Sequence, residues 1–69
     1  MYLEQDVQST AILHVGYDTD SHILSITFAN GAVYDYPDMT EDQYHRLVTA
    51  ESVGKYYNKS IAPIIRNRK

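Results

Sequence analysis

The sequence predicts an α+β fold: a three-stranded antiparallel β-meander followed by two short helices packed on one face. Three observations support this prediction, namely alternating apolar segments in the first half, an Asn-Gly hairpin signal at 30–31, and helix-start signals at Thr40 and Ser52. Strands that precede helices, rather than alternate with them, indicate an α+β domain. A chain of 69 residues is long enough for one such domain.

The first strand is expected at 10–17, where the segment TAILHVGY is rich in β-branched and apolar side chains. Residues 1–8 have a mixed composition, so we expect a flexible N-terminal segment there. The single domain is then expected at 9–64, with a basic tail at 65–69. Alternation divides the strand between two faces, with Leu13, Val15 and Tyr17 on one and Ile12, His14 and Gly16 on the other. The DTDSH segment that follows is typical of a turn.

A hairpin is expected next, because Asn30 and Gly31 lie between two segments of strand character. The first segment, ILSITFA at 23–29, alternates cleanly between apolar and polar residues. The second, AVYDYP at 32–37, ends at a proline, which cannot donate a hydrogen bond to the ladder.

The length of the hairpin loop decides where Tyr34 and Tyr36 point. A two-residue loop places both rings on the polar face of the preceding strand. A three-residue loop, with Gly31 in the left-handed conformation, places both rings on the apolar face and Asp35 on the polar face. Keeping a charged side chain off the core favours the longer loop. The two tyrosines would then pack under the helices, and the alternative is a stacking platform for a ligand.

The first helix is expected to begin after Thr40, which forms a capping box with Gln43. Acidic residues fill its first turn, where the helix dipole favours negative charge. Tyr44, Leu47 and Val48 recur at helical spacing and form the stripe expected to be buried.

The second helix is expected after Ser52, over VGKYYNKSIA at 53–62. Its apolar residues recur at intervals of three and four: Val53, Tyr56, Tyr57 and Ile61. Gly54 lies near the helix start, where it would allow close approach to another element. Pro63 is expected to end the helix, because the residue before a proline is biased away from helical angles.

Composition excludes several classes of protein. Cysteine is absent, which excludes disulfides and thiolate metal sites. The N-terminus has no signal-peptide pattern and no window is long and apolar enough to span a bilayer, so a cytoplasmic location is expected. The net charge of -3 argues against a general binder of polyanions.

No catalytic, metal or cofactor site is expected. The three histidines are dispersed in sequence without ligand spacing, and the DTDSH segment lacks most of the ligands of a calcium loop. The sequence contains neither a nucleophile elbow nor a glycine-rich phosphate loop. We therefore expect a protein that is not an enzyme.

Charge is divided unevenly along the chain. Residues 1–42 carry eight acidic and no basic side chains, whereas 43–69 carry all six basic ones and a single acid. The helical end is thus the candidate surface for phosphate groups, and its alternative is an ordinary solvated face. The cations that would neutralise phosphates are Lys55, Lys59, Arg66, Arg68 and Lys69. One of the two adjacent tyrosines, Tyr56 or Tyr57, would stack on a base.

Several short motifs occur together from about Val7 to Ile64. They are Val7 and Ser9, VGYD at 15–18, Leu24-x-Ile26-x-Phe28, Asn30-Gly31, Tyr34-x-Tyr36 and ESVGKYYNKSI at 51–61. In these motifs the chain resembles the KTSC domain family, whose landmarks are matched by Tyr34, Tyr36, Ser52, Gly54 and Tyr56. The family takes its name from a domain at the C-terminus of some lysyl-tRNA synthetases, and it also occurs as small stand-alone bacterial and phage-type proteins. The resemblance implies that the landmark residues are mostly structural. No activity is assigned to the family, and RNA binding has been suggested for it.

Two functions remain open at this point. The first is accessory binding of RNA or another nucleic acid through the basic helical end. The second is a protein-interaction module, such as a phage- or prophage-encoded modulator of a host protein, in which an acidic sheet face meets a basic partner. That face would include Asp18, Asp20 and Asp35. A domain this small also gains stability from self-association, so a homo-oligomer is a further expectation.

Overall fold

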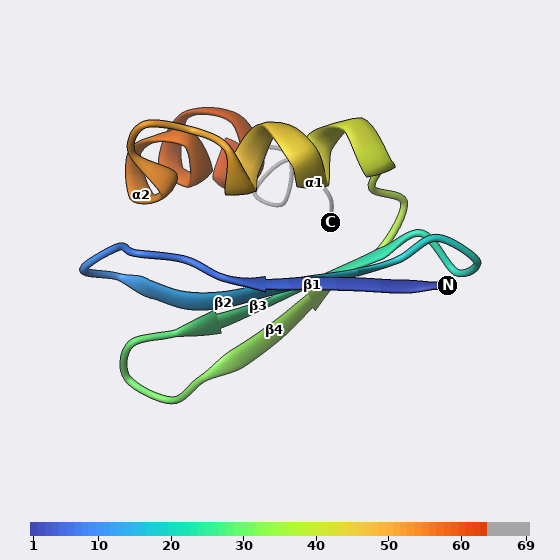
Figure 1. The fold of residues 1–69 in the computed structure, drawn as a ribbon, viewed down its shortest axis with the longest axis horizontal. Helices are drawn as coiled ribbons and strands as arrows, with labels where there is room; N and C mark the ends of the chain where they lie inside the picture. The colour runs from blue at the N-terminus through green and yellow to red at the C-terminus, as the bar shows by residue number, and fades with distance from the viewer. Residues whose placement is uncertain (64–69) are drawn as a thin grey trace.

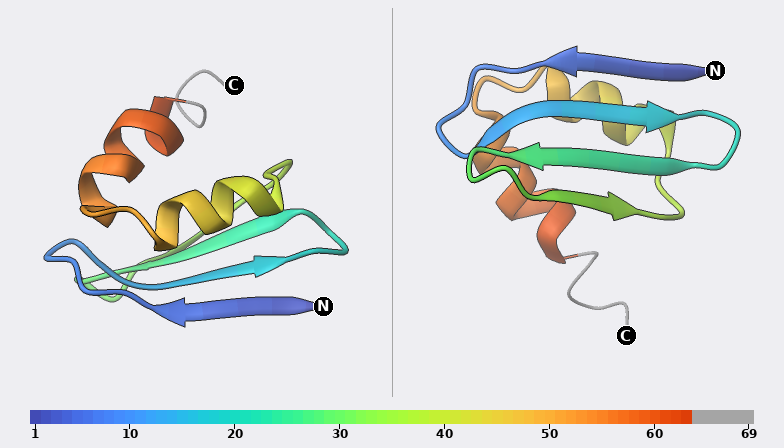
Figure 2. Two further views of the ribbon diagram at one scale, coloured as in Figure 1. Left: turned by 45° about the horizontal axis from the view of Figure 1, so that its top comes forward. Right: turned by 90° about the horizontal axis from the view of Figure 1, so that it is seen from below.

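A computed structural model describes residues 1–63 as a four-stranded antiparallel sheet with the helical segments on one side (Figure 1). The elements are β1 (Tyr2–Asp6), β2 (Ile12–Asp18), β3 (Ile23–Phe28), β4 (Val33–Tyr36), α1 (Glu41–Val48), α2 (Val53–Tyr56) and the π-helical η1 (Tyr57–Ile61). The strands lie in chain order, so each pairs with its sequence neighbour. The other face of the sheet carries no helix (Figure 2). Over the described residues, no helix has the length and apolar character needed to cross a membrane.

The structure corrects the predicted number of strands from three to four. The additional strand, β1, lies in the segment that was expected to be flexible. Its residues show no alternation because β1 is an edge strand in which only Leu3 is partly buried. Antiparallel pairing with β2 over five residues holds it instead, and the His14 ring of β2 adds bonds to Asp6 at 2.7 Å and to Glu4 at 3.0 Å. Contacts of this kind depend on the fold and leave no local sequence signal.

A β-bulge at the start of β2 changes the predicted faces of its first residues. Ile12 and His14 lie opposite consecutive residues of β3, which leaves Leu13 as the additional residue. Ile12 is consequently fully buried with Val15 and Tyr17, whereas Leu13, which was predicted to share a face with these two residues, is 49% exposed. Val15 and Tyr17 follow the bulge and share a face as predicted. Strict alternation assigns faces only where the pairing is regular.

The β3–β4 hairpin has the three-residue loop and the register that the sequence favours. Tyr34 and Tyr36 both lie opposite apolar residues of β3. Gly31 has a φ of 91°, in the region that only glycine adopts at low cost. Asp35 lies opposite Ser25, whose hydroxyl donates a hydrogen bond to the carboxylate at 2.6 Å. The charged side chain therefore remains on the open face of the sheet.

The two tyrosines of β4 share a face but differ in burial. Tyr36 is 7% exposed, and its hydroxyl lies 2.8 Å from that of Tyr57 in η1. Tyr34 is 53% exposed, so the prediction that it packs in the core is wrong. The physical reason is its position: the hairpin loop turns away from the helical layer at this end of the edge strand (Figure 1).

Helix α1 begins as predicted. The Thr40 hydroxyl accepts a hydrogen bond from the Gln43 backbone N–H at 3.2 Å, and the Gln43 side chain accepts one from the Thr40 N–H at 2.7 Å. Tyr44 and Leu47 are buried and Val48 is partly buried. The capping box thus orients the apolar stripe of α1 toward the sheet.

The second helical segment changes its winding partway along. The Ser52 hydroxyl accepts a hydrogen bond from the Lys55 N–H at 3.4 Å at the start of α2. From Tyr57 the chain is π-helical, and the Ala62 N–H donates to the Tyr57 carbonyl five residues earlier. Pro63 was predicted to end the helix by moving Ala62 away from helical angles. Ala62 nevertheless has helical angles, φ -58° and ψ -41°. The bias imposed by a following proline is a preference that packing overrides here.

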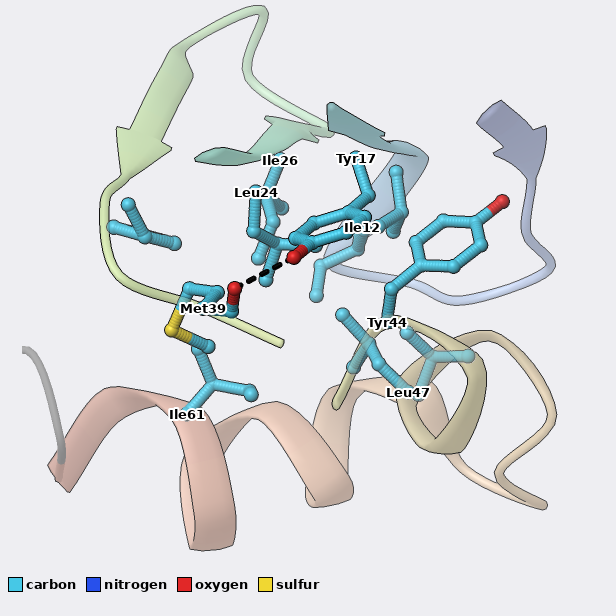
Figure 3. Packing of buried hydrophobic residues seen from close by; sticks show 11 residues of the cluster. Ile12, Tyr17, Leu24, Ile26, Met39, Tyr44, Leu47 and Ile61 are labelled. Carbon is cyan, nitrogen blue, oxygen red and sulfur yellow. Dashed lines mark hydrogen bonds between the residues drawn. The ribbon is translucent and has the colours of Figure 1, made fainter. Parts of the chain in front are cut away.

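One cluster of buried side chains fills the space between the sheet and the helices (Figure 3). Its members are Ile12, Val15, Tyr17, Leu24, Ile26, Tyr36, Met39, Tyr44, Leu47, Val53 and Ile61. The Tyr17 hydroxyl donates to the Met39 carbonyl at 2.7 Å inside this cluster. Among the described residues, every buried side-chain nitrogen or oxygen has a hydrogen-bond partner. The core is therefore apolar with its few polar atoms satisfied.

Candidate functional site

Three segments meet at one end of the molecule, which we call the loop end. They are the β1–β2 loop (7–11), the β3–β4 loop (29–32) and the start of α2, all on the left of Figure 1. Two surface hollows open there. The helix hollow, about 430 Å³, is lined by residues 8–11, 51–55 and Asn58. The tyrosine hollow, about 370 Å³, lies against Tyr34, and both hollows include Ala11 in their walls.

The helix hollow is formed by close approach of the β1–β2 loop to α2. A Cβ atom at Gly54 would lie 3.4 Å from the Ser9 hydroxyl oxygen, which is van der Waals contact, so the loop packs directly against this position. The same hydroxyl accepts a hydrogen bond from the Ala11 N–H at 3.3 Å, which shapes the loop. This confirms the close approach expected at Gly54. Two of the motif residues, Ser52 and Gly54, thus line one wall of the helix hollow.

The lysines of the helical end carry uncompensated charge. Within residues 1–63 the only other lysine or arginine is Arg46, whose guanidinium is 2.7 Å from the Asp42 carboxylate. Neither Lys55 nor Lys59 has a carboxylate within 4 Å in this part of the chain, and both side chains are exposed. Lys55 lines the helix hollow, which also contains the carboxylate of Glu51, and Lys59 lies four residues further along the helical segment. The remaining candidates, Arg66, Arg68 and Lys69, lie outside the described residues.

The adjacent tyrosines of the helical end are less accessible than expected. Tyr56 and Tyr57 are both partly buried against the core. Tyr57 is fixed by its hydroxyl contact with Tyr36 and by an edge-to-face contact with Phe28, with ring centroids 5.4 Å apart. These contacts leave little of the Tyr57 ring for a ligand.

The exposed aromatic ring at the loop end is Tyr34. It packs edge-to-face on Phe28, with centroids 5.5 Å apart and the planes at 73°. The ring borders the tyrosine hollow together with Asn30 and the apolar side chains of Ala11 and Ala29. The sequence predicted Tyr34 in the core, and its exposure follows from the hairpin loop turning away from the helical layer, which the sequence pattern does not indicate.

The buried tyrosines are structural. Burial raises the pKa of Tyr36 well above its ordinary value of 10, and its hydrogen bond with Tyr57 raises it further. Burial also raises the pKa of Tyr17 and of Tyr44. These phenols are neutral at physiological pH and serve as packed rings, and the hydroxyls of Tyr17 and Tyr36 are hydrogen-bonded.

The open face of the sheet is acidic. The register places four carboxylates there, and no lysine or arginine among the described residues: Glu4, Asp6, Asp18 and Asp35. His14 lies between two of these carboxylates, and the hydrogen bond to Asp6, aided by that to Glu4, raises the pKa of the imidazole. Asp20, expected on this face, lies instead in the β2–β3 turn, where it pairs with the N-terminal ammonium at 3.0 Å. No cluster of side chains within residues 1–63 is arranged to hold a metal ion.

Fold and site together define a small α+β domain: a meander sheet under two helical segments, with polar and aromatic hollows at one end. A sequence model of the KTSC domain matches residues 8–64. The chain belongs to the KTSC domain family, as its motifs indicate. A crystal structure of a KTSC domain protein from Yersinia pestis is similar, with a TM-score of 0.83 and 31% sequence identity. The likeness covers 90% of this chain and 87% of that one.

Two relatives extend the comparison across bacteria. A protein from Tsukamurella paurometabola is 37% identical over 62 residues, which is 90% of this chain and 92% of the relative. An uncharacterized protein from Stutzerimonas stutzeri is 32% identical over 57 residues, covering 83% and 80% of the two chains. The comparisons thus establish the family and the fold.

Proposed function

We propose that the protein is a non-enzymatic module that binds nucleic acid, in the first place RNA, at the loop end. The observation that carries this proposal is a pair of exposed lysines without an ion-pair partner among residues 1–63: Lys55 lines a polar hollow, and Lys59 follows four residues later in the same helical segment. Phosphate groups bound there would release condensed counterions, which is the main source of affinity for nucleic acids. Three further cations follow in the sequence at 66–69.

The polar lining of the helix hollow supports the same ligand. Ser9, Ser52 and Asn58 present hydroxyl and amide groups next to Lys55. Such groups commonly bond to phosphate and sugar oxygens, and these contacts position a strand without reading its sequence. Four of the nine acidic residues lie on the open face of the sheet, away from the helices, whereas the helix hollow has one acid, Glu51, beside Lys55 within the described residues.

The hollows also support a role without catalysis. Within the described residues, their titratable side chains are Glu51, Lys55 and Tyr34. The set lacks a nucleophile held against a general base, which acid–base or covalent catalysis requires. Binding is the function that this set of groups can perform.

Fluorescence anisotropy with a labelled single-stranded RNA, measured at increasing salt, tests the proposal. Lys55→Gln with Lys59→Gln should weaken binding and lower the slope of log affinity against log salt by about 1.4, at about 0.7 per phosphate contact. Arg46→Gln is the matched control, because that cation already has a carboxylate partner. Absence of binding at low salt, or equal binding by the double variant, would remove the proposal.

A second candidate function is binding of a basic protein surface by the open face of the sheet. The specific observation is the set of carboxylates on this uncovered face, of which Asp35 lies on the edge strand β4. Such a module would fit a phage- or prophage-encoded modulator of a host protein. Affinity purification should recover a partner with the wild type and lose it with Asp35→Lys. Recovery of background proteins alone would count against this function.

A further inference from the structure

We propose that the tyrosine hollow holds one unpaired nucleobase stacked on Tyr34, while the adjoining phosphates lie against Lys55 and Lys59. The inference rests on the proposed nucleic-acid function and narrows the ligand to single-stranded or looped segments. It also assigns the stacking role to a residue of the edge strand rather than to the tyrosines of the helix.

The Tyr34 ring is presented in a fixed orientation. The hairpin register places it on the helical face of the sheet, and the loop carries it beyond the helices, so that it is 53% exposed. Its edge-to-face contact with Phe28 supports the ring without enclosing it. A ring that is already ordered loses little conformational entropy when a base stacks on it.

The hollow combines apolar walls with one polar group of known orientation. The Asn30 side-chain oxygen accepts a hydrogen bond from the Ala32 N–H at 3.0 Å, which fixes the amide. Within residues 1–63 the amide nitrogen of Asn30 has no acceptor, so it can donate to a carbonyl oxygen on a base edge. The walls otherwise consist of Phe28, Ala11 and Ala29, which suit the apolar faces of a base.

The two hollows lie at the same end of the molecule and share one wall residue, which suits successive units of one strand. Ala11 belongs to the walls of both, with Tyr34 on one side and Lys55 on the other. A base in the tyrosine hollow would thus leave its phosphate near the lysine side of the loop end. Bases inside a duplex are stacked and paired, so a single-stranded segment meets this arrangement without the cost of unpairing.

Charge distinguishes this ligand from a peptide. An aromatic side chain of a protein partner would also fit the apolar walls, but it would leave the lysines without a counter-charge. The uncompensated charge of Lys55 and Lys59 favours a ligand that carries an anion for each base.

The test compares two labelled oligonucleotides of about eight residues: oligouridylate and an abasic strand of the same length and charge. Wild-type protein should bind the base-bearing strand about 5- to 150-fold more tightly, as expected for one stacked base. Tyr34→Ala should abolish this difference, Tyr34→Phe should keep it, and Lys55→Gln with Lys59→Gln should weaken both strands alike. Val33→Ala is the matched control, since Val33 is similarly exposed on the opposite face of β4.

The outcomes separate this inference from the proposed function. Equal binding of both strands that is insensitive to Tyr34→Ala but reduced by the lysine changes would overturn the base site and leave nucleic-acid binding intact. Absence of binding to either strand at low salt would overturn both, as would binding to a protein ligand alone. Thermal melts of each variant confirm that the compared proteins are folded.

Discussion

The two ends of the sheet differ in how closely their side chains are packed and bonded. At the end formed by the β2–β3 turn and the connection into α1, hydrogen bonds close the structure: the Tyr17 hydroxyl lies 2.7 Å from the Met39 carbonyl, and the Met39 N–H donates to the His22 carbonyl at 3.0 Å. We call this the turn end, on the right of Figure 1. The loop end instead opens into two hollows, with Tyr34 and Lys55 exposed.

The difference between the ends shows that so small a domain can leave one end open while the rest of the structure is closely packed. Stability is concentrated in the core and at the turn end, where side chains are buried and bonded. The loop end can therefore expose an aromatic ring and uncompensated charges at little cost to folding. Binding residues presented by loops on a rigid scaffold are a recurrent arrangement in proteins.

The largest expected effect lies at the turn end. Tyr17 is 1% exposed, and Tyr17→Ala should lower the free energy of unfolding by about 3–5 kcal/mol through cavity formation. Tyr17→Phe should cost about 1–3 kcal/mol, because the Met39 carbonyl loses its buried donor. Leu13→Ala at the loop end should change stability by at most about 0.5 kcal/mol. Urea unfolding measures all three, and similar losses at Tyr17 and Leu13 would refute the contrast.

The two helix caps sharpen the contrast at a smaller scale. Thr40 and Gln43 bond reciprocally near the turn end, whereas Ser52 makes a single longer bond of 3.4 Å at the loop end. We expect Thr40→Ala to cost about 1–2 kcal/mol and Ser52→Ala about 0.5 kcal/mol in urea unfolding. The opposite order would mean that α2 contributes more to the fold than its cap indicates.

The smallest expected effect concerns pH. His14 bonds to Asp6 and Glu4, and its pKa is raised in the folded state. The resulting stabilisation is fully present below the unfolded pKa of about 6.5 and is lost as the pH rises through the higher folded value. The free energy of unfolding should thus decrease slightly from pH 6 to about pH 8. His14→Gln should flatten this profile. An unchanged profile would show that the bonds from His14 to Asp6 and Glu4 contribute nothing to stability.

The sequence predicted those parts of the fold that local chemistry determines. Asn30 and Gly31 indicated the hairpin, the charge of Asp35 favoured the register that β3 and β4 have, and the capping box at Thr40 specified the start of α1. The strand β1 and the bulge at Leu13 were missed because both depend on pairing with distant residues.

The candidate site divides in the same way. Lys55 and Lys59 could be identified from charge alone, since they lie in the basic half of the chain. The walls of the hollows could not, because Ser9 and Gly54 meet only after the β1–β2 loop folds against α2. The exposure of Tyr34 likewise depends on where the helices end over the sheet. Tertiary packing decides these features, and no spacing of residues encodes them.

The most direct measurement applies two assays to two residues of β4. Tyr36→Ala should lower the free energy of unfolding by about 3–5 kcal/mol, because the ring is buried against the helices. Tyr34→Ala should cost at most about 1 kcal/mol, the scale of a single exposed aromatic contact, yet remove the preference for a base-bearing over an abasic strand. Strong destabilisation by Tyr34→Ala with an unchanged preference would contradict the assignment of one ring to the core and the other to the ligand.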